Sequence, residues 1–223
     1  MLDALLSLIL PQSCAGCAAR GALWGASCVA ELEPVGAPSC MRCGAPTRWA
    51  VPACRECQAF TPAFSSAWAA VAHRGAGAVL VRRWKDGGLD LADVAAQVIE
   101  ERRVPPDVDC LCAVPASPAR ARRRGIDGPG ALARSLGARW ELPLRRDLLR
   151  RSRDALPQRG LDQRARRVNL RGVFASAARA PLRVALIDDV YTTGATADAC
   201  ARALREGGAV HVEVLAFARA LRD

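Results

Sequence analysis

The sequence has few of the side chains that acid–base catalysis and base stacking use. Its 223 residues include two histidines, one tyrosine, four phenylalanines and five tryptophans. His73 and His211 are isolated, so no Ser-His-Asp or Cys-His arrangement for nucleophilic catalysis is evident. We expect both histidines to have structural roles. The scarcity of aromatic side chains argues against a surface built mainly to stack the bases of single-stranded nucleic acid.

The sequence also lacks a recognisable secretory signal and a long apolar run. The apolar stretch Leu2–Leu10 is interrupted by Asp3, follows no basic segment and is too short to span a bilayer. We therefore expect a cytoplasmic protein without a membrane span, in which thiols stay reduced. In that compartment the ten cysteines are better explained by metal binding than by disulfides.

Lysine is almost absent, since Lys85 is the only one, and the positive charge is concentrated in arginines. Sixteen arginines but only five acidic residues lie between Pro118 and Arg171. Such a block attracts phosphate, on a nucleotide-like ligand or along a nucleic-acid backbone. The alternative is a solvated basic surface, to which a codon bias toward arginine would contribute.

The cysteines divide the chain into two expected parts. Residues 1–62 hold seven of the ten cysteines, together with many Pro, Gly and Ala residues, and predict a small module of loops around metal. Residues 63–223 have apolar runs that alternate between strand-like and helix-like patterns. That alternation predicts an α/β domain with a largely parallel sheet.

The second part has a simple expected order of elements. We predict strands at 67–72, 110–114, 183–187 and 210–217, and helices at 77–84, 89–103, 129–140 and 195–206. A polar turn is expected directly after Ile187. Cys110, Cys112 and Cys200 fall within apolar patterns and are predicted to be core residues.

Two CxxC pairs in the first part have the spacing of a tetrahedral zinc site. They are Cys40, Cys43, Cys54 and Cys57, with ten residues between the pairs. A further set, Cys14, Cys17 and Cys28, supplies three thiolates. A second zinc ion is therefore left open, as is the pairing, because the two sets could interleave.

Two adjacent carboxylates, Asp188 and Asp189, follow the apolar segment Val184–Ile187. Ligands of parallel α/β sheets bind at the carboxyl ends of the strands. Carboxylates suit the hydrogen bonds of a vicinal diol. Taken alone, such a pair is more often a structural cluster that caps a helix.

The loop after the carboxylates is rich in hydroxyls and opens a helix. Backbone N–H groups of Thr193, Gly194, Ala195 and Thr196 would form an anion site, completed by the hydroxyls of Thr192, Thr193 and Thr196. Gly194 would let the backbone close around a phosphate. Together with the carboxylates, this loop would hold both ends of a ribose 5-phosphate.

The segment VALIDDVYTTGAT, Val184–Thr196, resembles the phosphoribosyl pyrophosphate (PRPP) motif of type I phosphoribosyltransferases, in the form found in the ComF/GntX family. Members of that family carry an N-terminal double zinc ribbon before a transferase-like domain. Lys85, Val114-Pro115 and Arg120–Gly125 are similar to further family segments, as are Pro157-Gln158, 167–170 and Phe174. The resemblance implies a type I phosphoribosyltransferase-like parallel sheet with a small zinc-ribbon module.

The sequence departs from the family at three places. Ala121 stands where the first arginine of the family's R-x-x-R-G segment falls. Gly125-Ile126-Asp127-Gly128 replaces the usual Gly-Phe-Asn-Gln, which would alter acceptor specificity or activity if the segment contacts substrate. Glu31 stands at the position of an expected zinc-binding cysteine, and a site with three thiolates and one carboxylate is unusual.

The resemblance implies transfer of phosphoribosyl from PRPP, with Mg²⁺, to a nitrogenous base. The residues it assigns to PRPP are Asp188, Asp189, Thr192, Thr193, Gly194, Ala195, Thr196, Lys85, Pro115, Ala116, Arg120 and Arg124. One alternative is a competence-type DNA uptake protein that binds single-stranded DNA, acts with other competence proteins and uses PRPP as ligand or regulator. A third is a scaffold that has kept the fold and lost the chemistry.

Overall fold

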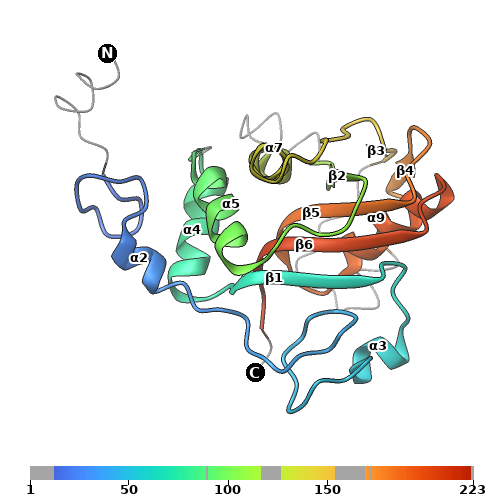
Figure 1. Cartoon of the computed structure of the whole chain (residues 1–223), viewed down its shortest axis with the longest axis horizontal. Coiled ribbons are helices and arrows are strands. Elements are labelled where there is room, and N and C mark those ends of the chain that lie inside the picture. The colour runs from blue at the N-terminus through green and yellow to red at the C-terminus, as the bar shows by residue number, and fades with distance from the viewer. Residues whose placement is uncertain (1–12, 89, 117–126, 154–168, 171, 222–223) are drawn as a thin grey trace.

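The computed structural model describes residues 13–88, 90–116, 127–153, 169–170 and 172–221. Its centre is a four-stranded sheet in which every neighbouring pair is parallel (Figure 1). The strand order is β1 (Ser66–Ala72), β6 (His211–Arg219), β5 (Arg183–Tyr191) and β2 (Cys110–Ala113). This confirms the α/β fold with a parallel sheet.

Helices cover both faces of this sheet. The helices α4 (Gly75–Lys85), α5 (Leu91–Arg102) and α7 (Gly128–Trp140) pack on one face through residues such as Leu80, Ile99 and Leu136. Helix α9 (Ala195–Glu206) packs on the opposite face (Figure 1). A short antiparallel hairpin, β3 (Leu149–Arg151) and β4 (Phe174–Ser176), shares the core of the α9 face.

The predicted turn directly after Ile187 is wrong. Strand β5 continues to Tyr191, because β6 is equally long and pairs with it to the end, with Asp188 opposite Ala216 and Tyr191 opposite Arg219. Both carboxylates therefore lie within the strand, near its carboxyl end. The other predicted strands and helices are present, with ends shifted by at most two residues. Cys110, Cys112 and Cys200 are buried in the core as predicted.

The cysteine-rich module lies on both faces of the sheet. Cys14 and Cys28, the latter in α2 (Ala26–Ala30), pack into the core beneath α4, α5 and α7. Cys40, Cys43 and Cys57 pack into the core on the α9 face, and Cys57 lies in α3 (Arg55–Ala59). Figure 1 shows α2 beyond the left end of β1 and α3 below its right end.

The segment between the two halves of the module runs along the edge of β1. Pro34 and Val71 form an antiparallel bridge, and the Ala72 N–H donates to the Glu33 carbonyl at 2.8 Å. Arg102 joins this segment to β1 by donating to the carbonyls of Leu32 and Ala70, each at 3.0 Å. The module is thus fastened to the edge of the sheet.

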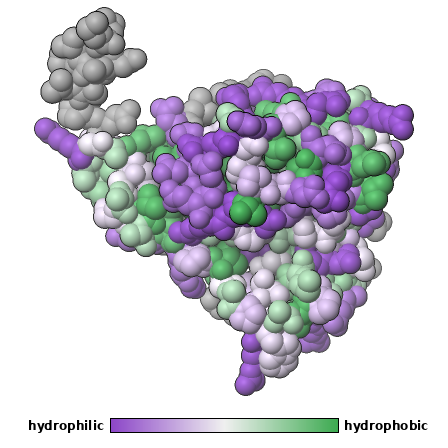
Figure 2. Space-filling model, viewed as in Figure 1, coloured by the Kyte–Doolittle hydropathy of each residue, from purple (hydrophilic) through white to green (hydrophobic). Residues whose placement is uncertain are grey.

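The face of the molecule shown in Figure 2 is strongly hydrophilic over the helices and less so over the lower lobe that contains α3. None of the helices within the described ranges is both long and apolar enough to cross a membrane.

Candidate functional site

Strand β5 and helix α9 are joined by the turn Thr192–Gly194 at the carboxyl edge of the sheet. Gly194 precedes the first residue of the helix and has φ = 73°, in the left-handed region. A Cβ atom at Gly194 would clash with the Tyr191 hydroxyl oxygen. The left-handed backbone and the nearby Tyr191 side chain therefore both favour glycine here. They add to the reason given from the sequence, which was close approach of the backbone to a phosphate.

The start of α9 has the features of an anion site. The first N–H groups of the helix, beginning at Ala195, have no hydrogen-bond acceptor within the helix, because no helical turn precedes them. The Ala195 N–H is 3.4 Å from the Thr193 hydroxyl oxygen, and the hydroxyl-bearing Thr192 is exposed. With the positive end of the helix dipole, these groups favour a phosphate at the turn.

The two carboxylates at the end of β5 have different surroundings. Asp189 Oδ2 lies 2.9 Å from Lys85 Nζ, at the end of α4. Asp188 Oδ1 accepts a hydrogen bond of 2.9 Å from the Asp189 N–H. Burial raises the pKa of Asp188 well above its usual range, and the negative charge of Asp189 adds to the effect. The surroundings of Asp188 thus favour its protonated form more than water does, next to the ion pair of Asp189 and Lys85.

The Val114-Pro115-Ala116 turn lies at the same edge of the sheet. The Val114 N–H donates to the Ile187 carbonyl at 2.9 Å, directly before Asp188. Pro115 and Ala116 are half-buried and follow at once. Of the other residues assigned to PRPP, Arg120 and Arg124 lie outside the described residues, as do Pro157 and Gln158.

Two residues at this edge were not assigned to the site from sequence. His73 follows β1 and its N–H donates to the Arg219 carbonyl at 2.7 Å. Burial and the positive charge of Lys85 lower the pKa of His73, against the opposite effect of Asp189. Arg219 ends β6. Both could have been found from the rule that the carboxyl ends of parallel strands share one edge.

A cavity of about 380 Å³ lies between the anion loop and the cysteine-rich module. Its walls include Tyr191, Thr192 and Gly194 from the loop and Arg219 from β6. The module contributes Cys43, Cys54 and Phe60, among other residues. The loop and the module therefore share one hollow surface.

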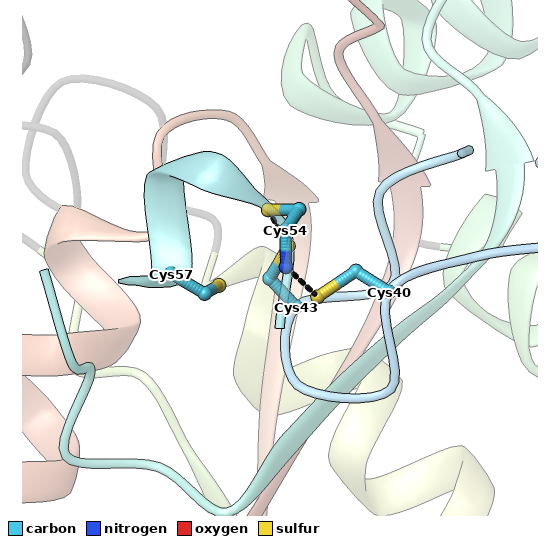
Figure 3. A group of neighbouring side chains, drawn as sticks. All are labelled: Cys40, Cys43, Cys54 and Cys57. Carbon is cyan, nitrogen blue, oxygen red and sulfur yellow. Dashed lines mark hydrogen bonds between the residues drawn. The ribbon is translucent and has the colours of Figure 1, made fainter. Parts of the chain in front are cut away.

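The CxxC pairs at Cys40 and Cys54 form one four-sulfur group, in which all four Sγ atoms lie within 4.8 Å of one another (Figure 3). Cys43 Sγ and Cys54 Sγ are 3.8 Å apart. Tetrahedral zinc with Zn–S bonds near 2.3 Å needs about 3.8 Å between sulfurs. The group therefore fits zinc.

Backbone donors support thiolates in this group. The Cys54 N–H lies 3.2 Å from Cys40 Sγ (Figure 3). Burial raises the pKa of Cys40, but hydrogen bonds from the N–H groups of Cys43, Cys54 and Arg42 outweigh it and bring the pKa to about 7. Such donors favour the ionised sulfur that a metal requires.

Cys14, Cys17 and Cys28 form a second group with sulfurs within 4.8 Å of one another. The N–H groups of Gly16 and Gly25 lie 3.4 and 3.3 Å from Cys14 Sγ. The two sets of cysteines do not interleave. No fourth ligand joins this group from the part of the chain that the structure describes, and Glu31 is exposed at the end of α2.

Asp127, which stands where the family pattern has asparagine, has a structural role. Its carboxylate Oδ1 accepts a hydrogen bond of 3.1 Å from the Gly130 N–H and so caps helix α7. An aspartate is among the best residues for this position.

Comparison with known proteins supports the assignment of an N-terminal zinc-ribbon module. Residues 5–58 match the double zinc ribbon domain. The chain is 33% identical over 116 residues to competence protein F of Haemophilus influenzae, a match that covers 50% of this chain and 51% of that protein. The chain thus spans about half the length of this relative. The two matches support a ComF-family assignment, and with the cysteine groups they support zinc binding.

Proposed function

We propose that this protein binds PRPP at the carboxyl edge of the sheet and transfers its phosphoribosyl group to a nitrogenous base, with release of pyrophosphate. The observation that carries the proposal is the continuity of β5 with the start of α9. Along that stretch a carboxylate pair, Asp188 and Asp189, is followed within a few residues by a hydroxyl-rich helix N-terminus. These are the groups that bind a ribose diol and a phosphate.

Each group has a part in holding the ligand. The Thr192–Thr196 turn receives the 5-phosphate on helix N–H groups and hydroxyls. Asp188 and Asp189 accept hydrogen bonds from the ribose hydroxyls. The Pro115-Ala116 turn and Lys85 face the pyrophosphate, whose charge the lysine balances. Mg²⁺ would be bound mostly by oxygens of the ligand and water, and would neutralise the leaving pyrophosphate.

The reaction needs positioning more than covalent chemistry from the protein. A nitrogen lone pair of the base forms a bond to the ribosyl C1, while the bond from C1 to the pyrophosphate oxygen breaks and its electron pair leaves with pyrophosphate. The nitrogen then loses its proton to water. The carbon passes through an oxocarbenium-like state, which the oriented polar groups at this edge of the sheet stabilise.

The Lys85–Asp189 pair prepares the site for an anion. Two adjacent ionised carboxylates would repel a phosphate-bearing ligand. Lys85 balances one of them at 2.9 Å, and burial raises the pKa of Asp188, which disfavours a negative charge on the other. The edge of the sheet can then receive a highly charged ligand at a lower electrostatic cost.

Calorimetric titration of the zinc-loaded protein with PRPP and Mg²⁺ tests this proposal. We expect binding to the wild type and none to a variant with Asp188→Asn and Asp189→Asn. Asp147→Asn is the control, because Asp147 is exposed and paired with Arg145 away from β5. The absence of binding to the wild type would refute the proposal. Binding by the wild type justifies a screen of acceptor bases.

A second candidate function is the handling of single-stranded DNA during uptake, in the cytoplasm and with other competence proteins. The relative's name connects it with competence. The observation that favours this function here is an exposed aromatic at the module surface. Trp49 is 62% exposed and Met41 68%, with the Arg48 guanidinium 5.6 Å from the Trp49 ring centre. A stacking ring beside a cation suits a nucleobase and its phosphate.

Fluorescence anisotropy with a labelled single strand at several salt concentrations tests this second function. We expect binding that weakens as salt rises. Trp49→Ala should weaken it severalfold, and Trp49→Phe should retain most of it. Equal loss in both variants would exclude stacking at Trp49. Under this second function, residues 1–62 contact the single-stranded DNA. Residues 63–223 bind PRPP, which is then a ligand or regulator.

A further inference from the structure

Arg219 lies between the four-cysteine group and the anion loop. It is only 7% exposed at the end of β6. Its guanidinium donates to the Cys43 carbonyl and lies 3.8 Å from Cys43 Sγ. One buried cation therefore contacts both the backbone and the sulfur of a metal ligand.

The same guanidinium lies against Tyr191. Its central carbon is 4.5 Å from the centre of the Tyr191 ring, and Tyr191 is itself only 6% exposed. The backbones are also joined, since the two residues are partners in the β5–β6 ladder and the Ala220 N–H donates to the Tyr191 carbonyl at 2.9 Å. Neither side chain can move far without the other.

Tyr191 in turn packs against the turn that begins α9. The close approach of its hydroxyl to Gly194 leaves no room for a Cβ atom. Phe64 also packs against the Tyr191 ring in a T-shaped arrangement, with 6.2 Å between ring centres. Cys43, Arg219, Tyr191 and Gly194 thus form a continuous row of contacts, and all four line the 380 Å³ cavity.

We propose that zinc at Cys40, Cys43, Cys54 and Cys57 and a phosphate-bearing ligand at the Thr192–Thr196 turn are energetically coupled, with Arg219 as the positioning residue. The part that concerns the ligand rests on the proposed function. Zinc fixes Cys43, and Cys43 fixes the guanidinium. The guanidinium and the β-ladder then hold Tyr191 against Gly194.

Loss of the metal would free Cys43, which is the first residue in the row of contacts that ends at Gly194. Zinc-binding loops lose their structure without the ion. Arg219 would then lack the Cys43 acceptors while still buried, a costly position for a cation. The Arg219 guanidinium would have to move, and the Tyr191 ring would lose its contact with that guanidinium. Because coupling is reciprocal, ligand at the turn must also slow the release of zinc.

The second cysteine group provides an internal contrast. Cys14, Cys17 and Cys28 lie on the opposite face of the sheet. Arg102 fastens the segment that follows them through the carbonyls of Leu32 and Ala70, at the edge of β1. Arg102 is half-buried and, like the more deeply buried Arg219, donates to backbone carbonyls, but its described contacts lie at the edge of β1 and not at the turn. We expect it to be uncoupled from the ligand.

Hydrogen exchange of the peptide that covers residues 191–197 tests the coupling without any ligand. In the zinc-loaded protein we expect slow exchange, which becomes about tenfold faster in Cys43→Ser and in Arg219→Lys. Cys14→Ser and Arg102→Lys should leave it unchanged. Arg219→Lys keeps the charge, and it carries the test should Cys43→Ser fail to fold. Unchanged exchange in Arg219→Lys, or equal acceleration in Arg102→Lys, overturns the inference.

Affinity for ribose 5-phosphate and the rate of zinc release to a coloured chelator complete the test. We expect Arg219→Lys to weaken ribose 5-phosphate about tenfold and to abolish the slowing of zinc release by this ligand. Wild-type binding with zinc release insensitive to the ligand would refute the coupling and leave the proposed function standing. Absence of PRPP binding in the calorimetric titration would refute the proposed function, and the exchange experiment would still decide whether zinc holds the turn.

Discussion

Lys85 and Asp189 form an ion pair of 2.9 Å between the end of α4 and the end of β5. The side chains are 36% and 17% exposed. The lysine is the only one in the sequence, and the fold brings it to one of two adjacent carboxylates at the edge where ligands of parallel sheets bind.

Removal of this lysine should weaken an anionic ligand. Lys85→Gln deletes the cation that balances Asp189 and would face pyrophosphate, so we expect PRPP affinity to fall about tenfold, or ~1.4 kcal/mol. Calorimetry at two salt concentrations measures the change. Arg82→Gln, an exposed position in the same helix, removes the same charge and should have little effect. Equal losses in the two variants would mean that only net charge matters.

We expect Asp188 to lower the free energy of unfolding at neutral pH and to be needed for PRPP binding. Its pKa is raised in the folded state, so its effect on folding is most favourable below the ordinary carboxyl pKa and is lost as pH rises through the raised value. Asp188→Asn removes the ionisable group. We expect this variant to gain stability over the wild type as pH rises from 4 toward neutrality, and to lose PRPP binding.

Urea unfolding between pH 4 and 8 measures the first effect and calorimetry the second. Asp147→Asn is the matched control. Its carboxyl pKa is lowered by Arg145, so its loss should reduce stability above the ordinary carboxyl pKa. A gain for Asp188→Asn that does not depend on pH would contradict the electrostatic explanation.

Gly194→Ala should distort the anion turn. The alanine would have to keep φ = 73° and would place its Cβ atom against the Tyr191 hydroxyl. We expect a loss of roughly 1–3 kcal/mol in unfolding free energy and weaker ligand binding. Gly172→Ala is the control for φ alone, because Gly172 has φ = 66° with open space around it.

Tyr191→Phe separates the two causes in Gly194→Ala. It removes the hydroxyl oxygen that the Cβ atom would meet most closely. The double variant should therefore recover part of the lost stability but not the part due to φ. If Tyr191→Phe restores nothing, the hydroxyl does not contribute to the cost, which then comes from the backbone conformation and the ring carbons of residue 191.

The two cysteine groups should differ in how firmly they hold zinc. Cys40, Cys43, Cys54 and Cys57 complete a tetrahedron, whereas Cys14, Cys17 and Cys28 leave one position for water or another ligand. We expect native mass spectrometry to find two zinc ions per chain, and a chelator to remove one much faster than the other. Cys14→Ser should abolish the fast phase only. Two equal phases would contradict a difference in coordination.

Much of the fold was predictable because its elements have strong local patterns. The apolar runs at Val184 and Val212 and the amphipathic pattern at Leu91 each specify an element without help from distant residues. The extension of β5 to Tyr191 was not predictable in this way. It depends on pairing with β6, which holds polar Asp188 and Asp189 in extended backbone.

The candidate site divides in the same manner. The Thr192–Thr196 turn is a local sequence signal, and the position of its helix was predicted correctly. The contacts of Arg219 with Cys43 and Tyr191 were not, because they join three segments that only the folded sheet brings together. The separate grouping of the two cysteine sets likewise required the structure.

Both outer strands of the sheet are paired with irregular chain. Pro34 bridges Val71 on β1, and Leu144 bridges Leu111 on β2, where the Arg145 N–H also donates to the Leu111 carbonyl at 2.9 Å. Unpaired strand edges invite other chains to add to a sheet. Removal of the N-terminal module would take away the cover of β1 and uncover apolar area on both sheet faces. We therefore expect a fragment that begins at residue 63 to self-associate through β1, and the module to protect the intact chain from aggregation.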